Sequence, residues 1–229
     1  MKFNQYTWNL YRQSSDRQKA IKEFEEAAEK YSEYGIFKKY NPYSAMFFTE
    51  QYFLDTCELF WGCLFDGVEK FKSAEEAKEF YMTLVVKGVH DKENTPIINE
   101  GEFQLILSAN DLLSFQLYYF APEYFFPNLF RCRFFELNRI ADIFEIELPS
   151  IPKKADYKER CMYYWNLCEV FHKFRSDNGL SPDELCAFLY DYAPNFISKE
   201  KIDIPQPAQA WFIGGKTDHK EAVLDKTFW

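Results

Sequence analysis

Glycine is scarce in this sequence, with 8 glycines among 229 residues, and no apolar stretch reaches the ~18 residues needed to cross a bilayer. Few glycines and 20% aromatic residues favour packed helices over a glycine-turned β-sandwich. The start of the chain, MKFNQYTWNLYRQ, is too polar for a targeting segment. We therefore expect a cytoplasmic protein with no membrane association.

Paired cysteines are also missing. The six cysteines stand at 57, 63, 132, 161, 168 and 186, all in segments that are expected to be helical, and no two form a C-x-x-C pair. This spacing matches no metal site, and we expect reduced, half-buried thiols in an intracellular protein. The sequence predicts no metal and no cofactor.

An excess of positive charge is absent as well. The chain has 27 basic and 36 acidic residues, which give a formal net charge of −9 and a pI near 5.0. Such a balance disfavours non-specific binding of the whole domain to phosphate backbones, although one local basic face would still be compatible with it.

Motifs for catalysis are not found. The sequence has no G-x-x-x-x-G-K-[ST], G-x-G-x-x-G, G-x-S-x-G or H-E-x-x-H pattern. His90 stands beside Asp91 and Glu93 in a polar segment where solvated side chains are expected, and His172 is expected to be a half-buried helix residue. An enzyme whose site combines His90, His172 or His219 with distant acids is the least favoured hypothesis, so no catalytic residue is predicted.

The densest apolar stretch of the chain is Leu112–Pro152, and the rest of the fold is expected to pack around it. From Asn128 onward this stretch predicts a helix, because large side chains recur at steps of four and three. The expected inner face carries Phe130, Phe134, Leu137, Ala141, Phe144 and Leu148. Pro149 and Pro152 end the helix.

Further helices are predicted on both sides of this stretch. The expected helices cover residues 4–12, 15–34, 50–66, 74–86, 101–115 (in short turns), 155–178 and 182–193. In the first of them, Tyr6, Leu10 and Trp8 are expected to face inward. A turn at Asn41–Pro42 precedes helix 50–66, and capping boxes at Ser73 and Ser181 precede helices 74–86 and 182–193. Helix 155–178 is expected to be the main partner of the central helix, and His90–Gly101 is expected to be an exposed loop. The fold class is therefore all-α, a bundle of about 7–9 helices.

The character of the chain changes after Ile197. Residues 198–209 are polar and punctuated by prolines, which predicts a linker after a helical domain of residues 1–197. Residues 210–229 contain AWFIGG, which predicts a strand. This tail either docks on the helical body or begins a second domain.

One stretch has residue types that can bind nucleic acid. Tyr118, Tyr119, Tyr124, Phe125 and Phe126 precede Arg131, Arg133 and Arg139, and aromatic rings with nearby arginines can stack on bases and neutralise phosphates. The competing interpretation, in which the aromatic residues are core and the arginines pair with acids, is favoured because this is also the best core candidate.

Two segments resemble parts of known families. The run FAPEYFFPNLFRCRFFELNRIADIFEIELPSIP, with DYKERCMYYWNLCEVFHKF and LSPDELCAFLYDYAP behind it, resembles helical regions of bacterial McrB-type restriction and related phage-defence proteins. AWFIGG followed by TFW resembles the start of an EVE domain, a PUA-like fold that holds modified bases. The resemblance implies a helical portion of a larger defence protein and transfers no functional residue.

Together these observations predict a non-enzymatic, all-α interaction or scaffold domain. Its expected partner is another protein or further domains of the same polypeptide. The alternative is a nucleic-acid recognition module that uses aromatics 118–126 and arginines 131–139.

Overall fold

The structure is a computed structural model that describes residues 3–91, 93–109, 111–130 and 133–199. These residues form an all-α fold, as predicted, with one short hairpin. The helices are α1 (Gln5–Gln13), α2 (Ser15–Glu29), α3 (Tyr34–Tyr40), α4 (Pro42–Ala45), α5 (Glu50–Leu64), α6 (Ala74–Lys87), α7 (Glu100–Ala109), α8 (Leu112–Phe120), α9 (Phe134–Phe144), α10 (Tyr157–Asn178), α11 (Pro182–Ala187) and α12 (Ala193–Lys199), and the π-helix η1 (Phe188–Tyr192) joins the last two. The predicted linker beyond Lys199 and the predicted strand in 210–229 lie outside the described residues.

The helix count in the described part of the chain is higher than the predicted 7–9. Two short helices, α3 and α4, occupy the segment that was expected to be a connection, and they meet at Asn41, whose side chain caps α4. The helix expected after Ser181 is divided into α11, η1 and α12. The sequence did not predict this division, because π-helical turns are rare and occur inside otherwise α-helical segments.

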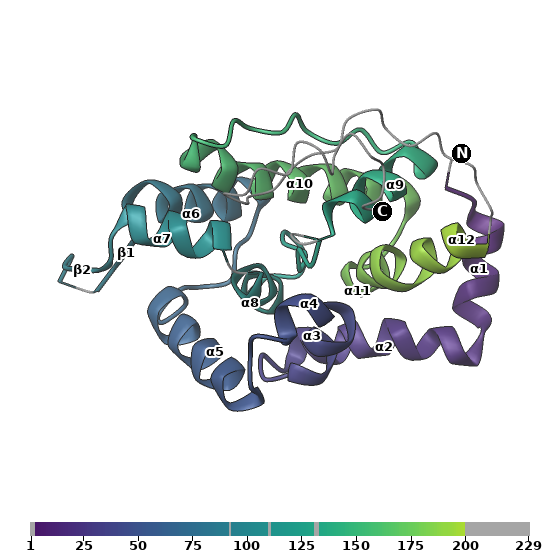
Figure 1. The fold of residues 1–229 in the computed structure, drawn as a ribbon, viewed down its shortest axis with the longest axis horizontal. Helices are drawn as coiled ribbons and strands as arrows, with labels where there is room; N and C mark the ends of the chain where they lie inside the picture. The colour runs from purple at the N-terminus through teal and green to yellow at the C-terminus, as the bar shows by residue number, and fades with distance from the viewer. Residues whose placement is uncertain (1–2, 92, 110, 131–132, 200–229) are drawn as a thin grey trace, which may run out of the picture.

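Helix α8 is the centre of the molecule. Eight of its nine residues are buried, including the polar Ser114 and Gln116. Figure 1 shows it between α6, α7 and α10 on one side and α2, α3 and α5 on the other. A helix that is buried on every face has no solvated side, so the expectation that the rest of the chain packs around this region is confirmed for residues 112–120.

The central helix is shorter than predicted. Helix α9 begins at Phe134, not at Asn128, and ends at Phe144, where Glu145 adopts a left-handed conformation with φ of 56°. Tertiary hydrogen bonds hold the preceding backbone instead. The Asn128 amide donates to Ser114 Oγ at 2.9 Å, and the Leu129 amide donates to Tyr190 Oη at 3.0 Å. These two bonds attach the backbone before α9 to α8 and η1.

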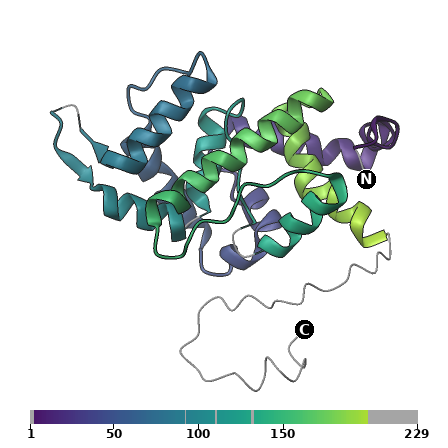
Figure 2. The same cartoon turned by 90° about the horizontal axis from the view of Figure 1, so that it is seen from above.

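The predicted inner face of this stretch is nevertheless largely correct. Phe130, Leu137 and Phe144 are almost completely buried, although Phe130 precedes the helix. The prediction that helix 155–178 is the main partner of the central helix is wrong, because α9 packs chiefly against α12, whereas α10 packs against α6, α7 and α11. Figure 2 shows α10 crossing the molecule.

The predicted inward face of helix α1 is correct for Trp8 and wrong for Tyr6 and Leu10. Trp8 and Tyr11 are buried, but Tyr6 and Leu10 are exposed. The indole of Trp8 lies edge-on to the ring of Tyr192, with 5.3 Å between the centroids. The face of this helix is therefore set by the C-terminal helices, which are distant in sequence.

The segment predicted as an exposed loop contains a two-stranded antiparallel hairpin. Strand β1 (Val89–His90) pairs with β2 (Pro96–Ile98), and the hairpin projects from the body in Figures 1 and 2. Asp91 Oδ1 accepts the amides of Glu93 and Thr95 at 2.9 and 2.8 Å, which closes the turn. Gly88 is required before β1, because its φ is 75° and a Cβ there would lie 2.1 Å from the Ile98 carbonyl oxygen.

The two predicted capping boxes differ in detail. At α11, Ser181 and Glu184 form the complete reciprocal box. At α6, Ser73 Oγ accepts the Glu76 amide at 3.2 Å, but the Glu76 carboxylate accepts the Lys72 amide, one residue before the predicted partner. Both helices begin where their sequences predict.

The described cysteines carry free thiols. Burial raises the pKa of Cys57 and Cys168 to about 12 and, more than offsetting the nearby Arg160, the pKa of Cys161 to about 11. Thiols with such pKa values are almost entirely protonated near neutral pH and act as small apolar side chains. Among the described residues, no helix is long and apolar enough to span a membrane.

Candidate interaction surface

The aromatic side chains predicted to contact bases lie mainly in the core. Tyr118 is buried, and its hydroxyl donates to the Phe24 carbonyl at 3.2 Å. Tyr119 is half-buried, and its hydroxyl donates to the Glu29 carbonyl. Phe125 and Phe126 are buried as well. The buried rings of Tyr118, Phe125 and Phe126 offer no open face on which a base could stack.

The predicted arginines have other roles where the structure describes them. Arg133 pairs with Glu136 at 3.2 Å and also donates to the carbonyls of Tyr40 and Leu129. Arg139 is half-buried on α9, and its Nε is buried without a hydrogen-bond partner in the described part of the chain. Arg131 lies outside the described residues. Nucleic-acid binding by these residues remains a prediction.

Tyr124, the remaining predicted residue, lies at the rim of a depression of about 220 Å³ between α6 and α10. Its lining includes Trp165, Glu169 and His172, and Lys78 Nζ lies 2.8 Å from Glu169 Oε1. Partial burial raises the pKa of Glu169, but the hydrogen bonds it accepts, first from Lys78, outweigh this effect and lower its pKa overall. A carboxylate stabilised in this way is a poor general base.

Both described histidines are exposed to solvent. His90 is exposed on the hairpin, and His172 is exposed on α10, not half-buried as predicted. His219 lies outside the described residues. In the described ranges, no cluster of three or more histidine, cysteine or acidic side chains could hold a metal ion.

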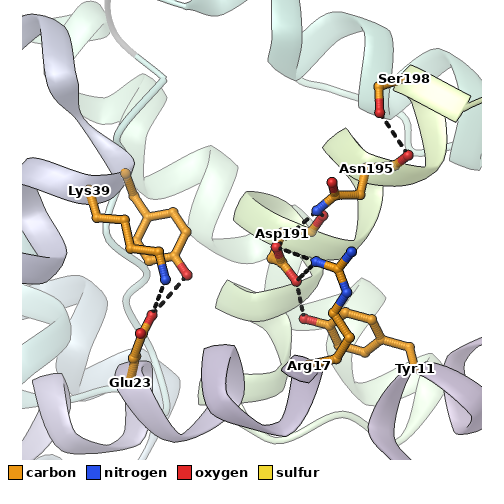
Figure 3. Close-up of polar contacts among 8 residues, drawn as sticks. Tyr11, Arg17, Glu23, Lys39, Asp191, Asn195 and Ser198 are labelled. Carbon is orange, nitrogen blue, oxygen red and sulfur yellow. Dashed lines mark hydrogen bonds and ion pairs between the residues drawn. The ribbon is translucent and has the colours of Figure 1, made fainter. Parts of the chain in front are cut away.

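A polar cluster with Asp191 at its centre joins the two ends of the described chain (Figure 3). The Asp191 carboxylate accepts hydrogen bonds from Tyr11 at 2.9 Å, from Arg17 at 2.9 and 3.0 Å and from Asn195 at 2.9 Å. Burial, followed by the proximity of Asp191, raises the pKa of Tyr11 well above its usual value. Both carboxylate oxygens are already engaged, so this cluster stabilises the docking of α1 and α2 on η1.

Large apolar side chains are exposed on one side of the molecule, at the junction of α4 and α5. Phe47 is 86% exposed and Met46 is 79% exposed, and Tyr43, Tyr52 and Leu59 are each more than half exposed. We name this region, with the exposed acids beside it, the acidic apolar surface. It comprises Tyr43, Met46, Phe47, Glu50, Tyr52, Asp55, Glu58 and Leu59.

A buried polar network fixes α4 beneath this surface. The Asp111 carboxylate accepts Asn41 Nδ2 at 2.7 Å and Ser44 Oγ at 2.9 Å, and all three residues are buried. Phe48 turns inward towards Phe37, with ring centroids 6.1 Å apart. Because the turn between α4 and α5 is held at these points, its Met46 and Phe47 side chains are directed outward on a fixed backbone.

Helix α5 continues the surface along an edge of the molecule (Figure 1). Phe53, Cys57 and Phe60 of α5 are buried in the core. Tyr52 and Leu59 lie seven residues apart on the opposite face and are exposed. One helix therefore supplies both a core face and an apolar outer face.

Sequence patterns did not predict this surface, although one signal was present. No lysine or arginine occurs between Lys39 and Lys70, whereas this segment contains five acidic residues, Glu50, Asp55, Glu58, Asp66 and Glu69. The sequence predicts only a turn at Asn41–Pro42 and a helix over 50–66 here, because a pattern does not distinguish an aromatic ring that packs from one that stays exposed.

The fold and the surface define an all-α domain with an exposed acidic apolar face. Comparisons with protein-family models, with curated proteins and with solved structures find no match to this chain.

Proposed function

We propose that this chain is a non-enzymatic helical interaction domain that binds a protein partner through the acidic apolar surface. The observation that carries the proposal is the exposure of Met46 and Phe47 on a turn whose backbone is held by buried contacts. Leaving such side chains in water is unfavourable, and large exposed apolar side chains that are close in the sequence and on adjoining helices are typical of a binding site. A pre-formed surface also lowers the entropic cost of association.

The resemblance to phage-defence proteins determines where a partner is sought first. Other subunits of a restriction or defence system, or further domains of the same polypeptide, are the first candidates within this proposal. A cytoplasmic location and a bacterial defence role are parts of the same proposal.

The proposal is tested with the double variant Met46→Ser/Phe47→Ser. Ile151→Ser is the matched control, because Ile151 is 65% exposed outside the acidic apolar surface. Candidate partners are identified by affinity purification from the natural host, purified, and titrated against each variant by calorimetry. We expect the double variant to raise the Kd at least about tenfold, which corresponds to about 1.4 kcal/mol, and the control to leave it unchanged. Equal affinities for the double variant and the wild type would refute the proposal.

A further inference from the structure

The charges and the row of apolar side chains on the acidic apolar surface indicate what kind of protein segment can bind to it. Asp55 is exposed and lies beside the apolar pair on α5, because it is three residues after Tyr52 and four before Leu59. Glu50 and Glu58 are exposed on other faces of the same helix. Asp55 accepts a hydrogen bond from Gln51 at 2.7 Å, and this neutral donor leaves the negative charge uncompensated. Glu50 and Glu58 have no ion pair within the described ranges. The exposed carboxylates of α5 therefore give this helix a negative field, and an exposed lysine that forms no ion pair within the described residues, Lys38, lies on the neighbouring α3.

The shape of the strip suits a helix. Helix α5 has 15 residues, which at 1.5 Å per residue gives a length of about 22 Å. Its outer face presents Tyr52 and Leu59 two turns apart, and Phe47 and Met46 extend the strip at the N-terminal end. A partner helix with apolar residues at spacings of three, four and seven would match such a row of contacts. The unbranched side chain of Met46 can adapt to different partner residues.

We propose that the acidic apolar surface binds a basic amphipathic helix of a partner protein, an inference that rests on the proposed function. The partner's apolar stripe would cover Met46, Phe47, Tyr52 and Leu59, and its lysines or arginines would face the carboxylates at the edges. Opposite charges across the rim increase the association rate and fix the orientation, while the apolar contacts supply most of the affinity.

The same charges disfavour other occupants. A phosphate backbone or an anionic lipid surface would be repelled by Glu50, Asp55 and Glu58. A symmetric dimer formed through this surface would place the acids of one copy against the same acids of the other. Residues 200–229 contain four lysines and five acids, so the C-terminal segment of this chain is not basic.

The test uses the full chain and three fluorescein-labelled 18-residue peptides, with binding measured by fluorescence anisotropy. The first is an amphipathic lysine–leucine helix, the second is a scrambled peptide of the same composition, and the third replaces every lysine with glutamate. We expect the amphipathic basic peptide to bind at least about tenfold more tightly than the other two, and its Kd to rise at least about tenfold between low and high salt.

Substitutions in this chain show where the basic peptide binds. Met46→Ser/Phe47→Ser is expected to weaken binding of the basic peptide at least about tenfold. Asp55→Asn/Glu58→Gln is expected to weaken it several-fold and to reduce its salt dependence, and Ile151→Ser is expected to have no effect. Equal binding of the scrambled peptide, or equal binding by the Met46→Ser/Phe47→Ser chain, would overturn the inference. Binding of neutral phosphatidylcholine vesicles, or a dimer that Phe47→Ser dissociates, would overturn it in favour of a membrane or a second copy.

The two proposals fail in different ways. If no basic peptide binds but a purified natural partner still depends on Phe47, the partner class is wrong and the interaction surface stands. If neither a peptide nor a natural partner depends on Phe47, both proposals are refuted.

Discussion

Replacing Phe188 with alanine is expected to lower the free energy of unfolding by about 4 kcal/mol, the cost typical of removing a fully buried phenylalanine. Phe188 is 0% exposed in η1. Its ring lies 4.9 Å from the rings of both Phe144 and Phe174, and 6.4 Å from the Trp8 ring, measured between centroids. Its loss would leave a cavity where α1, α9, α10 and η1 meet.

Urea denaturation followed by circular dichroism measures this effect, and Phe47→Ala is the matched control. Both variants remove the same atoms, but the Phe47 ring is 86% exposed and is expected to change stability by less than about 0.5 kcal/mol. Similar losses for the two variants would contradict the assignment of Phe188 to the core and of Phe47 to the surface.

Replacing Asp111 with alanine is expected to cost about 3 kcal/mol. Asp111 is 4% exposed, and its carboxylate accepts hydrogen bonds from Asn41 and Ser44, which are buried as well. Without the Asp111 carboxylate, the side-chain donors of Asn41 and Ser44 stay buried but have no acceptor, so the free-energy cost of removing them from water is no longer offset. The backbone of α4 would also lose its attachment to α8, so we expect partner binding by the neighbouring Met46 and Phe47 to weaken.

Thermal unfolding of Asp111→Ala is compared with that of Asp55→Ala, in which an exposed carboxylate of the acidic apolar surface is removed. We expect a fall of several degrees in Tm for the first variant and almost no change for the second. An Asp111→Ala chain as stable as the wild type would show that the buried network does not fix α4.

Helix positions that depend on local chemistry could be predicted from the sequence. The Ser181 capping box and Gly179, whose φ is 64°, set helix ends from residues within one turn. The start of α9 could not be predicted, because the Asn128 and Leu129 amides bond to Ser114 and Tyr190, which are distant in sequence. Helical spacing continues through such a segment even though its backbone bonds go elsewhere.

The candidate interaction surface could not be predicted for the same reason, because packing between helices decides which side chains stay exposed. The sequence presented Phe47 and Phe48 as equivalent apolar residues, and only the packing of Phe48 against Phe37 leaves Phe47 exposed. Aromatic density around Tyr118 and Phe126 suggested a base-binding surface, but density alone is equally typical of a core. The segment between Lys39 and Lys70 with no basic residue was the local signal for the surface that the structure exposes.

Site-specific photo-crosslinking tests the central claim most directly. Benzoylphenylalanine is placed at Phe47 in one chain and at Tyr157, a 49% exposed aromatic residue of α10, in another. Each chain is irradiated in its natural host. We expect the probe at position 47 to crosslink to a partner protein, and the Met46→Ser substitution to reduce the yield of this crosslink. The probe at position 157 is expected to give no crosslink to the same protein. Crosslinks from position 157 with none from position 47, or crosslinks from position 47 to nucleic acid alone, would contradict the central claim.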